Sequence, residues 1–508
     1  MPALTWPRSL APSDRVVAAL LVLATLTSRL PFTAATTAVD HDAAHFALAL
    51  ERFDLLHKQP HPPGYLLFLA PAALLHQAGL SPLTALTAIS VAFSAVGVLA
   101  TWRLGAAMFG AAAGLAAAVL LLSSPLYWSR GELPLAYTAE CALQALLGWA
   151  LWRATTAPGV ALPRAGAALG LAAGVRQDLL LFVGPLGAWV AYRARWRGAG
   201  GAAALLVAAA LVWAIPLVVL SGGPEAYLAA SRLQAGSVSP HTGLANLRAN
   251  TRVVVTALAW LGGAGWLVLP LWATRHGVRL LPRWRDDRLL FYAVWLLPPL
   301  LFFVAIFAKL DYLLSVAPGV AVLLGAALVA RVPGAVSRAL LLTVVATANA
   351  ALFLFWPAGN EEALGRRDIV AGDRLVAGYR DEVESRFDPG DAALLIPADS
   401  PFDFRTAMLE LPQFAVYVMD FEDSAPKEYM VAQGHSSTYP LPTGGAVVPV
   451  AEAVQALVWL SDAAPDPSWA VPAEAHATPE GVAYSVIPYP PGERALRLGP
   501  YLLARRTP

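Results

Sequence analysis

The chain has 508 residues, of which 57% are hydrophobic and only 14% are charged. Because soluble domains are about one quarter charged, this composition excludes an ordinary soluble protein and predicts an integral membrane protein. A net charge of +1 without any run of basic residues excludes nucleic acid as a partner. The single cysteine, Cys141, excludes an intramolecular disulfide.

Apolar runs of membrane-spanning length recur as far as Trp356. A further apolar run, Pro63–Leu75, is short and contains Pro71, so it is either a twelfth crossing or a helix at the membrane interface. We predict about eleven transmembrane helices, at Val16–Phe32, Leu83–Trp102, Ala111–Tyr127, Leu135–Trp152, Ala165–Val175, Leu179–Val190, Ala202–Leu220, Val253–Trp272, Leu289–Phe307, Leu313–Ala330 and Ala339–Trp356.

The distribution of arginine decides between the two alternatives, since basic loops remain in the cytoplasm. If Pro63–Leu75 does not cross and the N-terminus is cytoplasmic, the main arginine clusters all fall on the cytoplasmic side. We therefore predict a protein integral to the plasma (inner) membrane, with a cytoplasmic N-terminus and an extracytoplasmic C-terminus. Residues 35–82 then form the first extracytoplasmic loop.

The composition changes after Trp356, where Pro, Asp, Glu and Arg become frequent. We expect residues 1–357 to form a multi-span α-helical membrane domain. We expect residues 358–508 to form a small extracytoplasmic α/β domain, since about 150 residues suffice for one. A helix is expected over Arg367–Phe387, and the short apolar runs after it predict strands or short helices at Ala392–Pro397, Phe414–Met419, Val454–Leu460, Val482–Ile487 and Leu496–Leu503.

The first loop concentrates ionisable residues between two apolar segments, beginning with Asp40, His41 and Asp42. A carboxylate placed there is suited to accept a proton from a hydroxyl or to hold a cation. We expect Asp40 and Asp42 to be catalytic. The alternative is that they only cap the amphipathic segment that follows, since Asp is favoured at helix starts.

His41 and His45 are four residues apart, the spacing of one helical turn that helical metal sites use. Together with Asp42 they predict a possible site for a divalent cation. No other cofactor is indicated.

Further polar residues fall at the predicted outer ends of the spans. Glu132 is a third catalytic candidate, with an ion pair to Arg130 as the alternative. Arg176 suits a phosphate because its guanidinium donates in a fork; the alternative is a structural pair with Asp178. The expected substrate-binding residues are His61, Tyr65, Tyr137, Arg176, Asp178 and Lys309.

The order of these motifs resembles the GT-C glycosyltransferases, in particular the protein O-mannosyltransferase-like and aminoarabinose-transferase-like branches. The matching segments are Asp40-His41-Asp42, His61-Pro62-Pro63-Gly64-Tyr65, Ser124-Pro125-Leu126-Tyr127-Trp128 through Glu132, and Gly174-Val175-Arg176-Gln177-Asp178. The resemblance implies a polyprenyl-phosphate-linked sugar donor and an active site on the outer face. It places Asp40 at the catalytic acid and Glu132 at the second acidic position. His61 stands where the aminoarabinose branch has lysine, which argues against that substrate.

The sequence therefore predicts a GT-C-like membrane enzyme. It would transfer a sugar, with inversion, from a polyprenyl-phosphate carrier to an acceptor hydroxyl on a glycan, lipid or protein at the outer surface of the lipid bilayer. Two alternatives are a lipid or solute transporter and a membrane scaffold whose C-terminal domain binds a partner. Transporters usually place ionisable groups near the bilayer centre, whereas here such groups gather at the outer ends of the spans.

Overall fold

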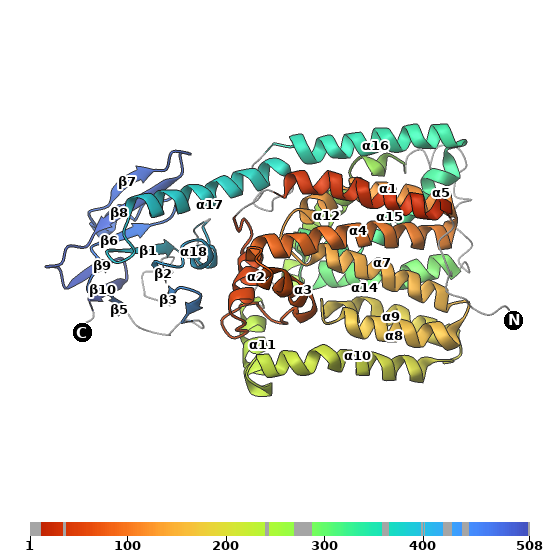
Figure 1. Ribbon diagram of the computed structural model, residues 1–508, viewed down its shortest axis with the longest axis horizontal. Coiled ribbons are helices and arrows are strands. Elements are labelled where there is room, and N and C mark those ends of the chain that lie inside the picture. The colour runs from red at the N-terminus through yellow and green to blue at the C-terminus, as the bar shows by residue number, and fades with distance from the viewer. Residues whose placement is uncertain are drawn as a thin grey trace.

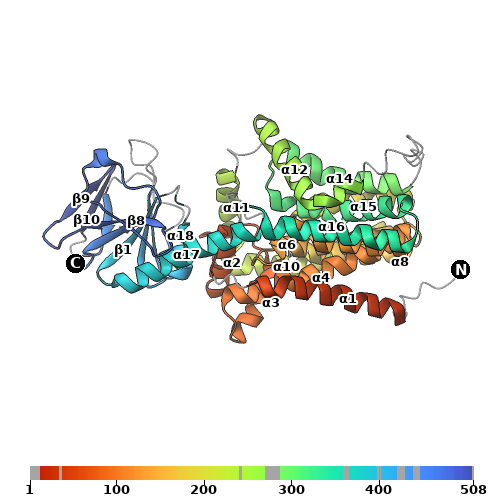
Figure 2. The same ribbon diagram turned by 90° about the horizontal axis from the view of Figure 1, so that it is seen from above.

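The structure is a computed structural model that describes residues 12–33, 37–238, 243–268, 287–357, 365–397, 400, 402–419, 429–438 and 447–505. Figure 1 shows a bundle of helices that run side by side and, beyond one end of it, a smaller part built around strands. Figure 2 shows the same two parts from above, with one helix, α17 (Arg366–Arg386), running between them.

The helices of the bundle follow the apolar segments of the sequence, because only helices satisfy their own backbone polar groups within an apolar environment. Each of the eleven predicted segments lies largely within one helix or two adjoining ones, although Val253–Trp272 extends past residue 268 and so outside the described residues. The elements are α1 (Pro12–Arg29), η1 (Leu30–Phe32), α2 (His41–Glu51), α3 (Leu66–Gln77), α4 (Pro82–Phe109), α5 (Ala111–Ser123), α6 (Pro125–Gly131), α7 (Tyr137–Ala154), α8 (Pro158–Ala172), α9 (Asp178–Arg193), α10 (Ala199–Leu220), α11 (Pro224–Val238), η3 (Leu244–Asn246), α12 (Leu247–Gly262), η4 (Gly263–Leu267), α14 (Asp287–Ala305), η5 (Leu310–Ser315), α15 (Ala317–Arg331) and α16 (Ala335–Phe355).

Within the described residues, four helices are long and apolar enough to cross a membrane: Ser13–Phe32, Pro82–Phe109, Ala199–Leu220 and Ala335–Phe355. The pair α5 and α6 meets the same test together but bends by 62°. These helices make the chain a multi-span membrane protein, while the predicted count of eleven is not established by their lengths. At 12 residues, α3 is about 18 Å long and too short to cross alone.

The strand-containing part is a small α/β domain. Its elements are α17, β1 (Ala392–Pro397), α18 (Phe404–Glu410), β2 (Ala415–Met419), β3 (Tyr429–Gln433), β4 (Ser436–Ser437), β5 (Val447–Val450), β6 (Ala456–Trp459), η6 (Pro467–Trp469), β7 (Glu474–Ala477), β8 (Ala483–Pro488), β9 (Ala495–Leu498) and β10 (Tyr501–Arg505). A seven-stranded sheet has the order β4-β3-β2-β1-β6-β8-β7, and a three-stranded sheet has the order β5-β10-β9.

The central strand β1 shows why this domain has two layers around its main sheet. It pairs in parallel with β2 and with β6, and all six of its residues are buried. Leu394 and Ile396 pack with residues of α17 and α18, whereas Ala393 and Leu395 pack with residues of the three-stranded sheet. A strand covered on both faces is expected to be continuously apolar, and this one is. The predicted boundary between the two parts, 357/358, adjoins residues 358–364, which are outside the described residues.

Candidate active site

A polar pocket of about 670 Å³ is lined by residues of α2 and of the segment that leads to α3. Figure 1 shows α2 and α3 at the end of the bundle nearer the α/β domain. Its walls come from α2, the segment between α2 and α3, the α8–α9 turn, α9, α11, the end of α14, the segment between α14 and η5, η5 itself, and α18. Of the residues expected to act, His41, Asp42, His45, His61, Tyr65, Arg176, Asp178 and Lys309 line this pocket. Asp40, Glu132 and Tyr137 are not among its lining residues.

Asp42 and Lys309 form the charged centre of the pocket. Lys309 Nζ lies 3.2 Å from Asp42 Oδ2, and Tyr137 Oη donates to the same oxygen at 3.4 Å. Burial alone would raise the pKa of Asp42, but Lys309 and His61 outweigh it and hold that pKa well below its usual range. Burial likewise opposes the charge of Lys309, but Tyr137 and the neighbouring carboxylates raise its pKa well above the ordinary value. At neutral pH the two side chains are therefore a carboxylate and an ammonium.

Two histidines face Asp42 from the other side. His45 Nδ1 and His61 Nδ1 are 3.1 Å apart, and His61 Nε2 lies 3.0 Å from Tyr65 Oη. Burial lowers the pKa of His61 to about 4 and that of His45 well below its usual range, so both rings are neutral at pH 7. Two neutral Nδ1 atoms at this distance share at most one proton, so at least one of the two is unprotonated and acts as an acceptor.

Asp42, His45 and His61 fit a divalent cation by their donor atoms. Asp42 Oδ1 is 4.0 Å from His45 Nδ1 and 3.7 Å from His61 Nδ1. A point at the centre of this triangle is about 2.1 Å from each atom, the usual length of a zinc bond to nitrogen or oxygen. Tyr65 holds the far nitrogen of His61, as partners of metal-bound histidines commonly do. This group differs from the predicted set of Asp42, His41 and His45: it contains His61, and it does not contain His41, whose side chain is 59% exposed.

Lys309 also contacts two further carboxylates. Its Nζ lies 3.8 Å from Asp311 Oδ2 and 4.0 Å from Asp40 Oδ2. Asp311 is in turn paired with Arg130, and both of these side chains are buried. Lys309 thus links Asp42 to Asp40 and to the buried Arg130–Asp311 pair.

Asp40 occupies the start of α2. Its Oδ1 accepts a hydrogen bond from the backbone N–H of Asp42 at 2.8 Å, the arrangement of a helix N-cap. The capping role considered from the sequence therefore applies to Asp40. Asp42, in the first turn of the helix, is the carboxylate that lines the pocket.

Arg176 lies on the pocket wall with two carboxylates beside it. Its Nη2 is 2.6 Å from Asp178 Oδ2, and its Nε is 3.1 Å from Glu140 Oε2. The guanidinium carbon also lies 5.1 Å from the ring centre of Tyr137 and 5.3 Å from that of Tyr312. These contacts fix the orientation of Arg176, which is only 7% exposed.

Glu132 lies apart from this group. It is 1% exposed and its Oε2 is 3.4 Å from Nη1 of Arg366, a residue of α17. The pair with Arg130 considered from the sequence is wrong, because Arg130 binds Asp311 from a distant segment instead. Glu132 therefore joins the helical bundle to the helix that leads into the α/β domain.

Two charged residues of the pocket were not singled out from the sequence. Arg405 comes from α18, and Lys58 comes from the segment between α2 and α3. Neither belongs to a recognisable motif, and nothing in the spacing of the sequence brings residue 405 near residue 58. The only feature of the sequence that points to Lys58 is the run of charged residues between Arg52 and His61.

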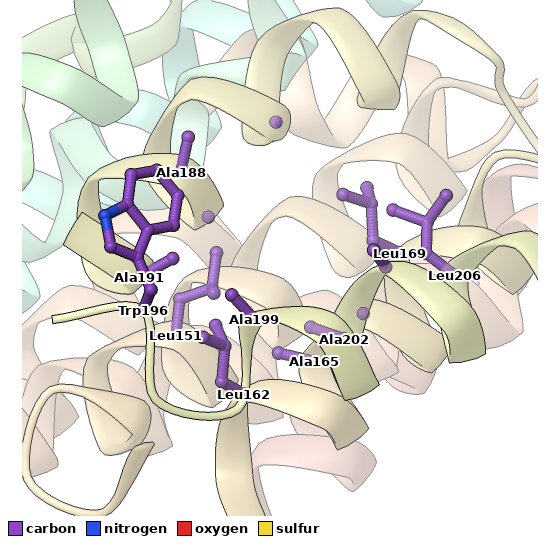
Figure 3. A pocket seen from close by; sticks show the side chains of 14 residues that line it. Leu151, Leu162, Ala165, Leu169, Ala188, Ala191, Trp196, Ala199, Ala202 and Leu206 are labelled. Atoms are coloured by element: carbon purple, nitrogen blue, oxygen red, sulfur yellow. The ribbon is translucent and has the colours of Figure 1, made fainter. Parts of the chain in front are cut away.

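A second cavity, of about 300 Å³, lies among α8, α9 and α10. Figure 3 shows that its labelled side chains are leucine and alanine with one tryptophan, so it offers no carboxylate, cation or histidine. It is not a site for acid–base or metal chemistry, and the polar pocket remains the candidate.

The fold and the pocket together define a class of protein: a helical membrane protein that carries an α/β domain and a polar site at the end of its bundle. No protein-family model matches the chain, and no curated protein matches it in sequence. Solved structures do match. ArnT from Cupriavidus metallidurans bound to undecaprenyl phosphate aligns with a TM-score of 0.56 at 13% identity, covering 94% of this chain and 98% of ArnT.

The apo form of the same ArnT aligns with a TM-score of 0.54, with the same identity and coverage. An oligosaccharyltransferase from Archaeoglobus fulgidus, in complex with zinc and sulfate, aligns with a TM-score of 0.48 at 14% identity, covering 93% of this chain and 75% of its own. The likeness to ArnT shows a shared fold, and the resemblance to GT-C proteins expected from the sequence is confirmed at that level.

Proposed function

We propose that the chain is a membrane glycosyltransferase that moves one sugar from a polyprenyl-phosphate carrier to an acceptor hydroxyl outside the cytoplasm. The observation that carries this proposal is the composition of the polar pocket. Asp42, Lys309 and two neutral histidines lie on its polar wall, while Phe182 and the end of α14 form an apolar wall. Such a pocket suits a ligand with a charged head and a hydrocarbon tail. The undecaprenyl phosphate bound to ArnT, which shares the fold, supports the same class of carrier here.

In the proposed reaction, the acceptor oxygen attacks the anomeric carbon of the sugar from the face opposite the phosphate. The bond between that carbon and the acceptor oxygen forms while the bond to the phosphate oxygen breaks, so the configuration inverts. A carboxylate takes the proton of the acceptor hydroxyl, and the carrier leaves as polyprenyl phosphate. We assign the proton to Asp42, because it lines the pocket and is ionised at neutral pH. Asp40 is the second candidate in the same motif.

Positive charge near the departing phosphate is proposed to come from Arg176 and Lys309. Groups held in place before the reaction stabilise developing charge without reorganising, and both side chains are held by carboxylates. The alternative role of Asp42 is to hold a divalent cation together with His45 and His61; the cation would act as a Lewis acid toward the phosphate oxygens, and Asp40 would then be the carboxylate left to take the proton. The proposed location is the plasma (inner) membrane, with the pocket and the α/β domain outside the cytoplasm.

The test is transfer of labelled sugar from its polyprenyl-phosphate carrier by the full chain in a membrane preparation that supplies acceptors. Asp42→Asn is expected to lower transfer by about 100-fold or more, the scale of a lost general base. Glu51→Gln is the control, since Glu51 belongs to α2 as Asp42 does and pairs with His76 away from the pocket lining. Full transfer by both Asp42→Asn and Asp40→Asn would overturn the proposal. Movement of the labelled lipid without a covalent product would favour a transporter.

A further inference from the structure

The α/β domain holds the loop that carries the candidate site. Thr37 donates to Asp373 of α17 through its backbone N–H and through its hydroxyl. The next residue, Ala38, donates its N–H to Glu410 of α18 at 3.3 Å and accepts from the Thr406 hydroxyl at 3.4 Å. These contacts fix the backbone directly before α2.

The far end of the same loop is held by the β3–β4 turn. Arg52 Nη1 donates to Ser436 Oγ at 2.8 Å, and Gln59 Nε2 donates to the His435 carbonyl at 2.9 Å. Figure 1 shows α18 and β3 on the side of the domain that faces α2. The domain is therefore placed firmly enough against the loop to contribute a side chain to the pocket.

Arg405 is that side chain. It lies on α18, is 9% exposed, and lines the pocket together with residues of the bundle. Its guanidinium carbon lies 4.1 Å from the ring centre of Phe404, and Nη1 is 3.9 Å from Asp403 Oδ2. A buried arginine facing a pocket is suited to bind phosphate or carboxylate through parallel N–H donors.

Lys58 lines the same pocket from the loop. Two backbone hydrogen bonds between Asp54 and Gln59 close the segment that presents it, at 2.6 and 2.9 Å. Its φ of +59° is a left-handed conformation that is unfavourable for a residue other than glycine. Backbone strain of this kind gathers at functional sites. Burial, and then the nearby charge of Arg405, lower the pKa of Lys58 to about 8. The two cationic side chains are therefore close enough to repel each other.

The elements that line the pocket differ in chemistry. Phe302 and Phe303 at the end of α14, and Phe307 just after it, are apolar and lead to Lys309, where a lipid carrier would place its tail and phosphate. Lys58 and Arg405 come instead from the loop and from the α/β domain, and neither is assigned above to the sugar carrier. Their positive charge is therefore available to the second substrate.

We propose that Arg405 and Lys58 form a second anion-binding subsite, which binds a phosphate or carboxylate group carried by the acceptor near its reacting hydroxyl. This inference rests on the proposed function and makes the α/β domain part of the substrate-binding site. Arg405 and Lys58 are binding residues, and the sugar carrier binds elsewhere in the same pocket.

The experiment measures the binding of two probes, inorganic phosphate and undecaprenyl phosphate, to the full chain in detergent. Arg405→Gln and Lys58→Gln are each expected to weaken inorganic phosphate binding by about tenfold, the scale of one lost charge-assisted hydrogen bond. Both are expected to leave the affinity for undecaprenyl phosphate within about twofold, while Arg405→Lys retains phosphate binding. Arg497→Gln, which removes an exposed arginine of β9, is the matched control.

Because Lys58 and Arg405 belong to different parts of the fold, each variant tests the subsite if the other fails to fold. Unchanged phosphate binding in the folded variants would overturn the inference. An equal loss of undecaprenyl phosphate affinity would also overturn it, since the anion would then belong to the donor. If the unaltered chain binds inorganic phosphate but no undecaprenyl phosphate, the proposed function fails while the anion subsite stands.

Discussion

Lys309 Nζ lies 3.2 Å from Asp42 Oδ2, although 267 positions separate the two residues in the chain. The contact joins the first turn of α2 to the segment between α14 and η5. It supplies the positive charge that keeps Asp42 ionised in a largely buried position. The ionisation of Asp42 in the first loop therefore depends on a residue from the far half of the bundle.

Replacing Lys309 with glutamine should raise the pKa of Asp42, because the charge that lowers it is removed and the opposing effect of burial remains. Since the carboxylate is the active form, activity is lost as pH falls through that pKa. The acidic limb of the pH–rate profile of sugar transfer should therefore move to higher pH in Lys309→Gln. Lys309→Arg, which keeps the charge, should leave the limb near its original position; the same displacement in both variants would contradict this account.

Divalent cation binding should depend on His45 and His61 and not on His41. His45→Ala and His61→Ala each remove one of the three donor atoms. Each should lower the affinity for the cation by about tenfold or more, because even the loss of a group that only hydrogen-bonds a metal ligand has an effect of that size. His41→Ala is the control, because His41 is exposed and outside the triad. The readout is the zinc that the purified chain retains after it has been loaded with zinc and the unbound zinc has been removed by dialysis. Equal retention in all three variants would exclude this site.

Asp311→Asn should destabilise the bundle strongly. It leaves Arg130 buried without its carboxylate, and breaking a buried pair costs about 3–5 kcal/mol. Asp287→Asn is the matched control, since the Asp287–Arg193 pair is about half exposed and such pairs contribute about 1 kcal/mol or less. Thermal unfolding in detergent compares the two. A similar fall in Tm for both variants would argue against a buried Arg130–Asp311 pair.

Phosphate binding at the proposed subsite should weaken as pH rises through about 8, where Lys58 loses its proton. The charged groups that act on Lys58 are Arg405, which lowers its pKa, and Asp42 and Asp403, which raise it. In Arg405→Gln the pKa of Lys58 should therefore rise, although burial still keeps it below the pKa of a free lysine. The alkaline limb of phosphate binding should move to higher pH by the same amount. A titration of phosphate affinity between pH 6 and about 10 measures the limb, and an unmoved limb in Arg405→Gln would contradict the coupling.

Local features of the chain could be predicted from the sequence because they depend on nearby residues. The apolar runs gave the helices of the bundle, and the run Ala392–Pro397 coincides with β1. Helix α17 begins and ends within one residue of the predicted Arg367–Phe387. The capping alternative for Asp40 also followed from local preference.

Contacts between distant segments could not be predicted in this way. His61 replaced His41 in the cation triad because the loop folds back over α2, which no helical spacing indicates. Arg130 pairs with Asp311 across 181 positions instead of with the nearby Glu132. Arg405 reaches the pocket only because the α/β domain docks on the first loop. A single sequence carries no signal for such pairings.

The most direct test of the central claim is a structure of the full chain with polyprenyl phosphate bound. The account predicts that the phosphate lies in the polar pocket, between Asp42 with Lys309 on one side and Arg176 on the other. The hydrocarbon tail should leave past the phenylalanines of α14. A phosphate bound outside this pocket, or no binding at saturating lipid, would contradict the account.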